Sequence, residues 1–353
     1  HGPIVSGDPA KGYGIAFRYT ATAELNTGFQ SLRTMVEATS AEEMDESMRD
    51  WVDPCNNFLM ADVHGNIFYL NRGKVPIRSM ANAWLPVPGW TGEHEWQGFI
   101  PFKELTRSRN PDTGYIVTAN NKIVGKDYPY YIALDFAPGF RARRVTDRIL
   151  QIPSATAQDM AAVHGEKVSI PARTYARLLA QVKPRDGLSA RAAERLLRWD
   201  GTMDRDAIAP TIYSAFRNRL NRAILSHLLG PLAEEALTST GQGALGPAGR
   251  LAALFVSAAQ ENDVTLLPPG TDWNEQMALA LAEGVAYLHD RLGEDMDSWE
   301  WGKVHFSYPQ HTLSRSFPEL AHMLNPPSIP MGGDGDTPQA AGYSPADLFA
   351  VTS

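Results

Sequence analysis

Residues 57–70 read Asn-Phe-Leu-Met-Ala-Asp-Val-His-Gly-Asn-Ile-Phe-Tyr-Leu, and this stretch predicts a β-hairpin. Its arms are residues 57–62 and 67–70, and the segment between them holds the turn. Gly65 suits that turn because glycine adopts the left-handed backbone conformation without steric penalty. The hairpin indicates that the first part of the chain contains β-structure.

Other strands and one short helix are predicted around this hairpin. Gly12–Ala21 is rich in aromatic and small residues, and Gly114–Ala119 forms a second candidate strand that ends at Asn120. Between them, Ser40 and Glu43 fit a capping box, in which the Ser hydroxyl accepts from a free backbone N–H and the Glu reaches back. We therefore expect a helix that runs from this cap to about Trp51.

A helical pattern begins at about residue 144. One apolar stripe at four-residue spacing predicts a long helix that ends at Gly230-Pro231; it consists of Ile208, Ile212, Phe216, Leu220, Ile224 and Leu228. Met277–Leu292 predicts another helix, and Gly and Pro concentrate in residues 325–345. The order indicates an α+β protein with a largely helical insertion. We expect an α/β portion over 1–150, a mainly helical region over 151–300, and a loop-rich segment with short strands over 301–353.

Composition excludes several classes of protein. The 353 residues contain 32 Lys+Arg and 40 Asp+Glu, a net charge of −8, which argues against binding to a nucleic-acid backbone. Hydrophobic residues make up 43% of the chain, enough for a sizeable core. The single cysteine, Cys55, excludes an internal disulfide and a cysteine-based metal cluster. No apolar run approaches the roughly 20 residues of a membrane helix.

Several catalytic and metal-binding motifs are incomplete. The segment that begins His94-Glu95 has Gly98 where a zinc-binding H-E-x-x-H motif needs its second His. His305 and His311 have no cysteine nearby, so we expect solvent or turn histidines rather than a metal site. Gly332–Thr337 resembles part of a calcium loop without its closing Glu, and an ordinary turn is the better interpretation.

A series of motifs follows in order along the first part of the chain. They are His1–Val5, Asn57–Ile67, Gly73–Arg78, Leu85–Gly89, Gly92–Gly98 and Asn110–Asn121. In order and spacing, these motifs resemble the β chain of the penicillin amidase (penicillin acylase) family. Members of that family are N-terminal-nucleophile hydrolases, with relatives that deacylate cephalosporins and acyl-homoserine lactones. The resemblance is dense over residues 1–150 and resumes around Gly332–Tyr343.

The resemblance implies a fold and two catalytic positions. The fold would be part of the αββα four-layer sandwich of these hydrolases. The family's oxyanion donor is an Asn side chain, which matches Asn120; the alternative is that Asn120-Asn121 is only a turn. The family also has an Arg before a Val, which matches Arg144 best. The choice between Arg143 and Arg144 stays open, and the alternative is a solvated basic cluster at a helix start.

The resemblance also implies a pocket and a metal. The residue before the Asn57 strand takes part in acyl specificity in the family, so Asn56 and Asn57 are expected at the substrate. A polar Asn56 argues against a pocket for a plain phenylacetyl group, and the alternative is that it caps the strand end. No cofactor is required. A structural calcium is expected in many members, with Asp135 in the region of one ligand.

The expected function is that of an amidohydrolase that cleaves an acyl group from a small amide. Residue 1 is His, which is not a hydroxyl or thiol nucleophile, so the nucleophile is expected upstream of this chain. We expect this chain alone to be inactive. The implied partners are the rest of a β chain and an α chain from the same precursor, in a periplasmic or secreted location, without nucleic acid or membrane. The alternatives are a non-catalytic homologue that holds an acyl or amide ligand, and an acyl-homoserine lactone acylase.

Overall fold

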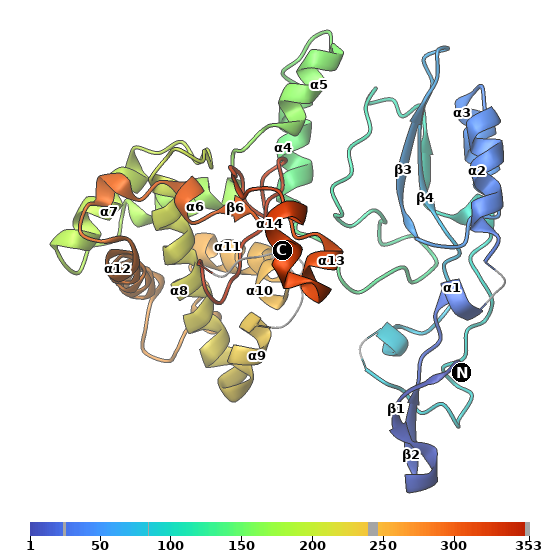
Figure 1. Ribbon diagram of the computed structural model, residues 1–353, viewed down its shortest axis with the longest axis horizontal. Coiled ribbons are helices and arrows are strands. Elements are labelled where there is room, and N and C mark those ends of the chain that lie inside the picture. Colours follow the sequence, from blue (N-terminus) through green and yellow to red (C-terminus); the bar gives the residue numbers. More distant parts are fainter. Residues whose placement is uncertain (24–25, 84, 239–245, 350–353) are drawn as a thin grey trace. The chain divides into compact units, whose positions relative to one another are not determined.

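The computed structural model describes residues 1–23, 26–83, 85–238 and 246–349. The chain forms two compact units, His1–Phe136 and Ala137–Ser353. In the described part of the first unit, short α-helices accompany short strands (Figure 1). They are β1 (Ile4–Asp8), β2 (Tyr13–Ala16), α1 (Thr20–Ala23), α2 (Gly28–Glu37), α3 (Ala41–Ser47), β3 (Asn56–Ala61), β4 (Ile67–Arg72) and β5 (Arg107–Arg109).

The hairpin predicted from residues 57–70 is confirmed. β3 and β4 pair antiparallel, with Asn57 opposite Asn71 and Ala61 opposite Ile67. Gly65 in the turn has a φ of 87°, as the turn chemistry requires. Asp62 closes the turn because its Oδ1 accepts from the backbone N–H of Asn66 at 3.0 Å. The hydrogen bond from the Asn66 side chain lowers the pKa of Asp62 to about 2, with further backbone donors acting in the same direction.

The helix predicted after Ser40 is present and shorter than expected. Ser40 Oγ accepts from the N–H of Glu43 at 3.1 Å. The Glu43 carboxylate reaches back to the N–H of Thr39 at 2.7 Å, one residue beyond the partner that a capping box uses. α3 ends at Ser47 rather than near Trp51.

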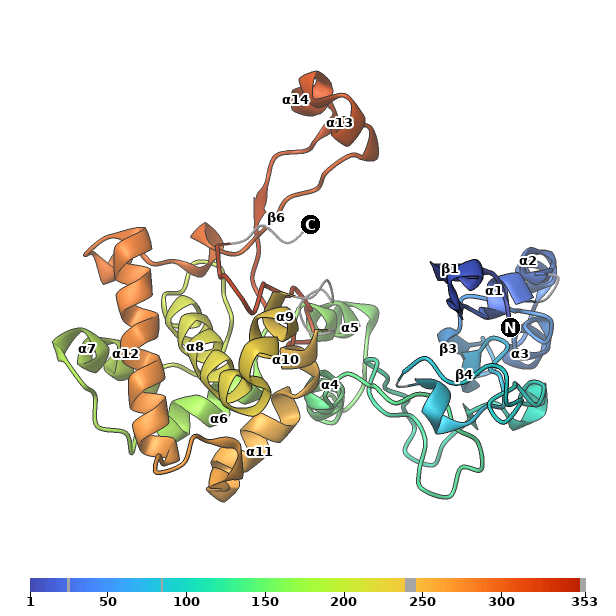
Figure 2. The same cartoon turned by 90° about the horizontal axis from the view of Figure 1, so that it is seen from below.

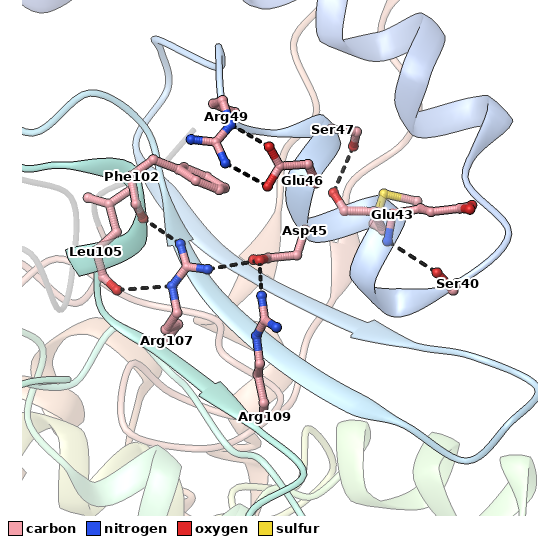
Figure 3. Close-up of polar contacts among 11 residues, drawn as sticks. Ser40, Glu43, Asp45, Glu46, Ser47, Arg49, Phe102, Leu105, Arg107 and Arg109 are labelled. Atoms are coloured by element: carbon pink, nitrogen blue, oxygen red, sulfur yellow. Dashed lines mark hydrogen bonds and ion pairs between the residues drawn. The ribbon is translucent and has the colours of Figure 1, made fainter.

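One ion cluster ties α3 to the third strand of the hairpin's sheet. Figure 3 shows Arg107 and Arg109 converging on Asp45, whose Oδ2 lies 2.8 and 2.6 Å from their nitrogens. Asp45 is only 3% exposed, so its charge needs these partners. Beneath α3, both strands of the hairpin contribute to one apolar core. Its buried members are Ala41, Met48, Trp51, Met60, Phe68, Leu70, Val75, Ile100 and Leu105.

Two strand predictions need correction. Of Gly12–Ala21, only β2 is a strand, paired with β1, because the chain turns into α1 at Thr20. Gly114–Ala119 forms no strand at all. A strand needs a neighbour to pair its backbone N–H and C=O groups, and no described residue pairs with this segment in a ladder. The third strand of the sheet is instead β5.

The second unit is mainly helical, and Figure 2 shows its two longest helices side by side. α13 and α14 lie at the tip of an arm that leaves the other helices (Figure 2). The elements are α4 (Phe140–Ile149), α5 (Ala157–His164), α6 (Ile170–Leu179), α7 (Gly187–Leu197), α8 (Ala209–Leu229), α9 (Ala233–Thr238), α10 (Pro247–Arg250), α11 (Ala252–Glu261), α12 (Trp273–Leu292), β6 (Phe306–Ser307), α13 (Thr312–Ser316), α14 (Ala321–Leu324) and β7 (Ile329–Pro330).

The central part of the four-residue stripe forms the buried face of α8, since Ile212, Phe216, Leu220 and Ile224 are each 0% exposed. The two ends differ from the prediction, because Ile208 precedes the helix and Leu228 is 43% exposed. α12 crosses this helix at Gly284, where an added Cβ would lie 2.9 Å from the carbonyl carbon of Ala215. The two backbones therefore approach more closely than any other residue at that position would allow.

The structure confirms the mixed class, with small sheets and many helices. No helix in the described residues is long and apolar enough to span a bilayer. The three-part division of the sequence stays a prediction.

Candidate active site

Asn120 lies in an irregular segment of the first unit and has a φ of 62°. Asparagine tolerates this left-handed conformation better than most residues. Its side chain is exposed, whereas the neighbouring Asn121 turns its amide back onto the chain. Asn121 Oδ1 accepts from the N–H of Ala119 at 3.0 Å, and its Nδ2 donates to the carbonyl of Lys122 at 3.1 Å. The turn is thus held by Asn121, next to the exposed Asn120.

Asn56 and Asn57 point to opposite faces of the hairpin, because adjacent residues in a strand alternate. Asn56 Oδ1 accepts from Arg72 Nε at 2.7 Å. Asn57 Oδ1 accepts from the Tyr69 hydroxyl at 2.7 Å and from Asn71 Nδ2 at 3.3 Å. A pocket on one face of this hairpin therefore meets only one of the two predicted asparagines.

The Asn56 face carries a buried cation. Arg72 is 9% exposed, and its guanidinium lies 3.9 Å from the centroid of the Trp51 ring and 4.5 Å from that of Phe58. Burial lowers the pKa of Arg72, although the group stays charged. The oxygen of Asn56 is a neutral acceptor for this cation, so the side chain anchors Arg72 at the start of β3.

The Asn57 face carries an uncharged hydrogen-bonding cluster. Tyr69 is 7% exposed, and burial raises the pKa of its phenol, which keeps the hydroxyl protonated as a donor. The sequence analysis did not predict Tyr69 and Asn71 as neighbours of Asn57. The register of the predicted hairpin offered a signal, because it places Asn71 directly opposite Asn57.

Arg144 lies on α4 in the second unit, where its Nη2 donates to Glu166 Oε2 at 3.0 Å. The side chains of both residues are mostly buried, at 13% and 12% exposed. Arg143 is exposed, so the two candidate arginines differ in their surroundings. An arginine near a helix start needs a counter-charge, and Glu166 supplies it. Nothing in the sequence around Glu166 predicts its contact with Arg144.

Asp135 is exposed in the loop that precedes the second unit. Calcium takes six to eight oxygen ligands, usually with several carboxylates. Among the described residues, no three His, Cys, Asp or Glu side chains are placed to hold a metal ion. A role for Asp135 as one calcium ligand therefore stays a prediction.

The two histidines considered for a metal site have structural roles. His305 is 5% exposed and stacks on Trp301, with ring centroids 4.4 Å apart. The expectation of a solvent or turn histidine is therefore wrong for this residue. His311 caps α13, because its Nδ1 accepts from the N–H of Leu313 at 3.2 Å.

The segment Gly332–Thr337 is a buried turn rather than a calcium loop. Asp334 Oδ1 accepts from the N–H of Asp336 at 2.8 Å. Asp336 Oδ2 lies 2.7 Å from Arg217 Nη1 on α8, and both side chains are buried. This carboxylate is thus used by an internal ion pair.

Comparisons with known proteins agree with one another. A family model described as penicillin amidase matches residues 1–353. The chain is 34% identical over 348 residues to the penicillin acylase 2 proenzyme of Pseudomonas sp. strain SE83, covering 98% of this chain and 44% of that protein. It is 24% identical over 373 residues to the acyl-homoserine lactone acylase QuiP of Pseudomonas aeruginosa, covering 94% of this chain and 42% of the relative.

A solved structure gives the fold. A thermostable penicillin G acylase from Alcaligenes faecalis superposes with a TM-score of 0.67 at 21% identity, covering 85% of this chain and 58% of that one. The chain spans less than half of the length of the two relatives above. The fold is therefore that of this N-terminal-nucleophile hydrolase, and the chain belongs to the penicillin amidase family.

Proposed function

We propose that this chain is part of an acyl amidohydrolase and supplies its oxyanion donor, Asn120. The observation that carries the proposal is the family match over the whole chain, together with the exposed position of Asn120 in a turn that Asn121 holds. A side-chain amide donates to a developing oxyanion without bringing charge or a proton that titrates. From the family resemblance, we also propose a catalytic role for Arg144.

The proposed reaction needs groups that lie outside this chain. An N-terminal Ser, Thr or Cys attacks the amide carbonyl, and its own α-amino group takes the proton. The carbonyl oxygen gains negative charge, which the amide of Asn120 stabilises, and the proton then passes to the leaving amine. Water hydrolyses the acyl-enzyme in a second, similar step. The family is generally independent of organic cofactors, and we assign no step to a metal ion.

We further propose that the remainder of a β chain and an α chain from one precursor complete the enzyme. The Pseudomonas relative is by name a proenzyme, which supports this assembly. A periplasmic or secreted location follows from the same resemblance, and fractionation of the producing cells tests it.

The test uses the full-length protein that carries this chain and a series of acyl p-nitroanilides. Asn120→Asp keeps the size and the left-handed backbone but replaces the donor with an acceptor. We expect kcat to fall about 100- to 1,000-fold, as for the loss of other oxyanion donors. Asn262→Asp is the matched control, since Asn262 also has a positive φ but ends α11 in the second unit. Activity of Asn120→Asp within tenfold of the parent would contradict the assignment.

The same substrate series separates the alternatives. The similarity to QuiP favours a second candidate, an acyl-homoserine lactone acylase. Faster turnover of long aliphatic acyl lactones than of aromatic acyl amides would support it. Binding of acyl amides by the parent protein without any turnover would instead support a non-catalytic homologue.

A further inference from the structure

Glu166 is the point where two arginines of α4 meet. Arg144 Nη2 donates to Glu166 Oε2 at 3.0 Å, and Arg148 Nε lies 3.1 Å from the same oxygen. The side chain of Glu166 is 12% exposed, so its charge is mostly shielded from water. A carboxylate in this position sets the direction of both guanidinium groups, because each is attracted to one small, fixed target.

The carboxylate of Glu166 is itself held in place. Its Oε1 accepts from the backbone N–H of Val168 at 3.1 Å, while its Oε2 contacts Arg144 and Arg148. The backbone carbonyl of Glu166 accepts from the N–H of Gln339 at 2.9 Å. Its side chain and its backbone are thus both fixed, and the residue cannot follow a movement of α4 freely.

The contact with Gln339 connects Glu166 to the buried turn at Gly332–Thr337. The hydroxyl of Thr337 donates to the carbonyl of Gln339 at 2.7 Å, and the N–H of Gly333 donates to Met203 at 2.7 Å. Gly333 has a φ of 84°, and an added Cβ would lie 2.3 Å from the carbonyl oxygen of Gln339. Only glycine fits there, so this late part of the sequence forms a rigid support under Glu166.

The ion pair with Glu166 does not satisfy every N–H donor of Arg144. Arg144 Nε is buried and has no hydrogen-bond partner among the described residues. A buried N–H donor without an acceptor is unfavourable, and such groups in folded proteins usually have a function or a partner not yet in place. Because the guanidinium is planar and Glu166 binds its Nη2, the other N–H donors of Arg144 also point in fixed directions.

We infer that Glu166 is a positioning residue for Arg144, and that the Gly332–Gln339 segment supports it. The inference rests on the proposed function, in which Arg144 belongs to the site. Two distant motifs of the resemblance thus contact the same residue, because Arg144 and Gln339 of the Gly332–Tyr343 motif both bind Glu166. The inference assigns Glu166 no contact with the substrate.

The experiment compares variants of the full-length enzyme. Glu166→Gln keeps a carbonyl acceptor for Val168 but removes the charge that holds Arg144. We expect kcat to fall about 10- to 100-fold, the loss expected from one charge-assisted hydrogen bond, with KM changed less than about threefold. Arg148→Gln is the matched control, because it removes the other partner of the same oxygen and should leave kcat within about threefold.

A double variant distinguishes positioning from simple stabilisation. If Glu166 acts through Arg144, then Glu166→Gln should change kcat less than about twofold in an Arg144→Gln background. Circular dichroism at the assay temperature confirms that each variant is folded, so that a lower rate cannot be ascribed to unfolded protein.

The outcomes separate this inference from the proposed function. A loss of kcat in Arg144→Gln without a loss in Glu166→Gln overturns the positioning role alone. Full activity in Arg144→Gln overturns both that role and the assignment of Arg144. Equal losses in Glu166→Gln and Arg148→Gln, or additive losses in the double variant, also overturn the inference, because they indicate a general effect on α4.

Discussion

Replacing Asp336 with Asn tests the buried ion pair that joins α8 to the turn at Gly332–Thr337. Asp336 Oδ2 lies 2.7 Å from Arg217 Nη1, and the two side chains are 6% and 10% exposed. Arginine does not lose its proton in proteins, so the variant leaves a positive charge buried without its partner. The same helix offers a matched control, Arg222 with Glu234 at 2.6 Å, where the side chains are 34% and 61% exposed.

The two pairs differ in burial and therefore in the expected cost. Breaking a buried pair by removing one partner costs about 3–5 kcal/mol, whereas an exposed pair contributes about 0–1 kcal/mol. We expect the lower end of the first range for Asp336→Asn. The neighbouring Asp334 is attracted by Arg217 and repelled by Asp336, so it ionises more readily once Asp336 is neutral. That ionisation returns part of the lost counter-charge.

The assay is thermal unfolding of the full-length protein, followed by circular dichroism and by calorimetry. A loss of about 3 kcal/mol lowers the unfolding temperature of the second unit by about 6–12 °C, and Glu234→Gln should lower it by less than about 3 °C. Equal shifts for the two variants would refute the reasoning. They would mean that burial does not set the value of these ion pairs, or that Arg217 readily finds another acceptor.

Two further predictions concern the second unit. Burial and the charge of Asp336 raise the pKa of Asp334 from 3.8 to about 6, so its folded state holds a proton more tightly than its unfolded state. The Asp334 carboxyl should then contribute fully to stability below about pH 4 and lose that contribution as the pH rises to about 6. Asp334→Asn should flatten this part of a stability–pH curve, and an unchanged curve would contradict the prediction. Gly284→Ala should destabilise by about 1–3 kcal/mol despite a gain in helix propensity of about 1 kcal/mol, because the added Cβ meets the backbone at Ala215. Urea unfolding measures this, and a stabilised variant would show that α8 and α12 separate easily.

Local patterns predicted the elements whose signals lie within one segment. The hairpin around Gly65 and the buried stripe of α8 follow from turn chemistry and from four-residue spacing, and both are confirmed. Gly114–Ala119 has the composition of a strand, but its backbone has no ladder partner among the described residues. Pairing is a property of two segments, so composition alone did not decide it.

The candidate site was predictable only in part, for a similar reason. The resemblance named Arg144 but gave no hint of Glu166, because their contact depends on how two segments pack. The alternation of a strand places Asn56 and Asn57 on opposite faces, which could be predicted from the hairpin, and their roles at the substrate stay a prediction. The burial of His305 was not predictable either, because its ring stacks on Trp301 and its Nδ1 lies 3.0 Å from the carbonyl oxygen of Met331, a residue distant in the sequence.

The ion pair of Arg217 and Asp336 also constrains how the protein is made. The two residues are 119 positions apart in the chain. At about 5–20 residues per second, a ribosome adds Asp336 about 6–24 s after Arg217. During that interval the guanidinium of Arg217, which is buried in the folded protein, has no Asp336 carboxylate to pair with. The helical unit therefore completes this buried ion pair only late in synthesis, after the segment around Asp336 has been added.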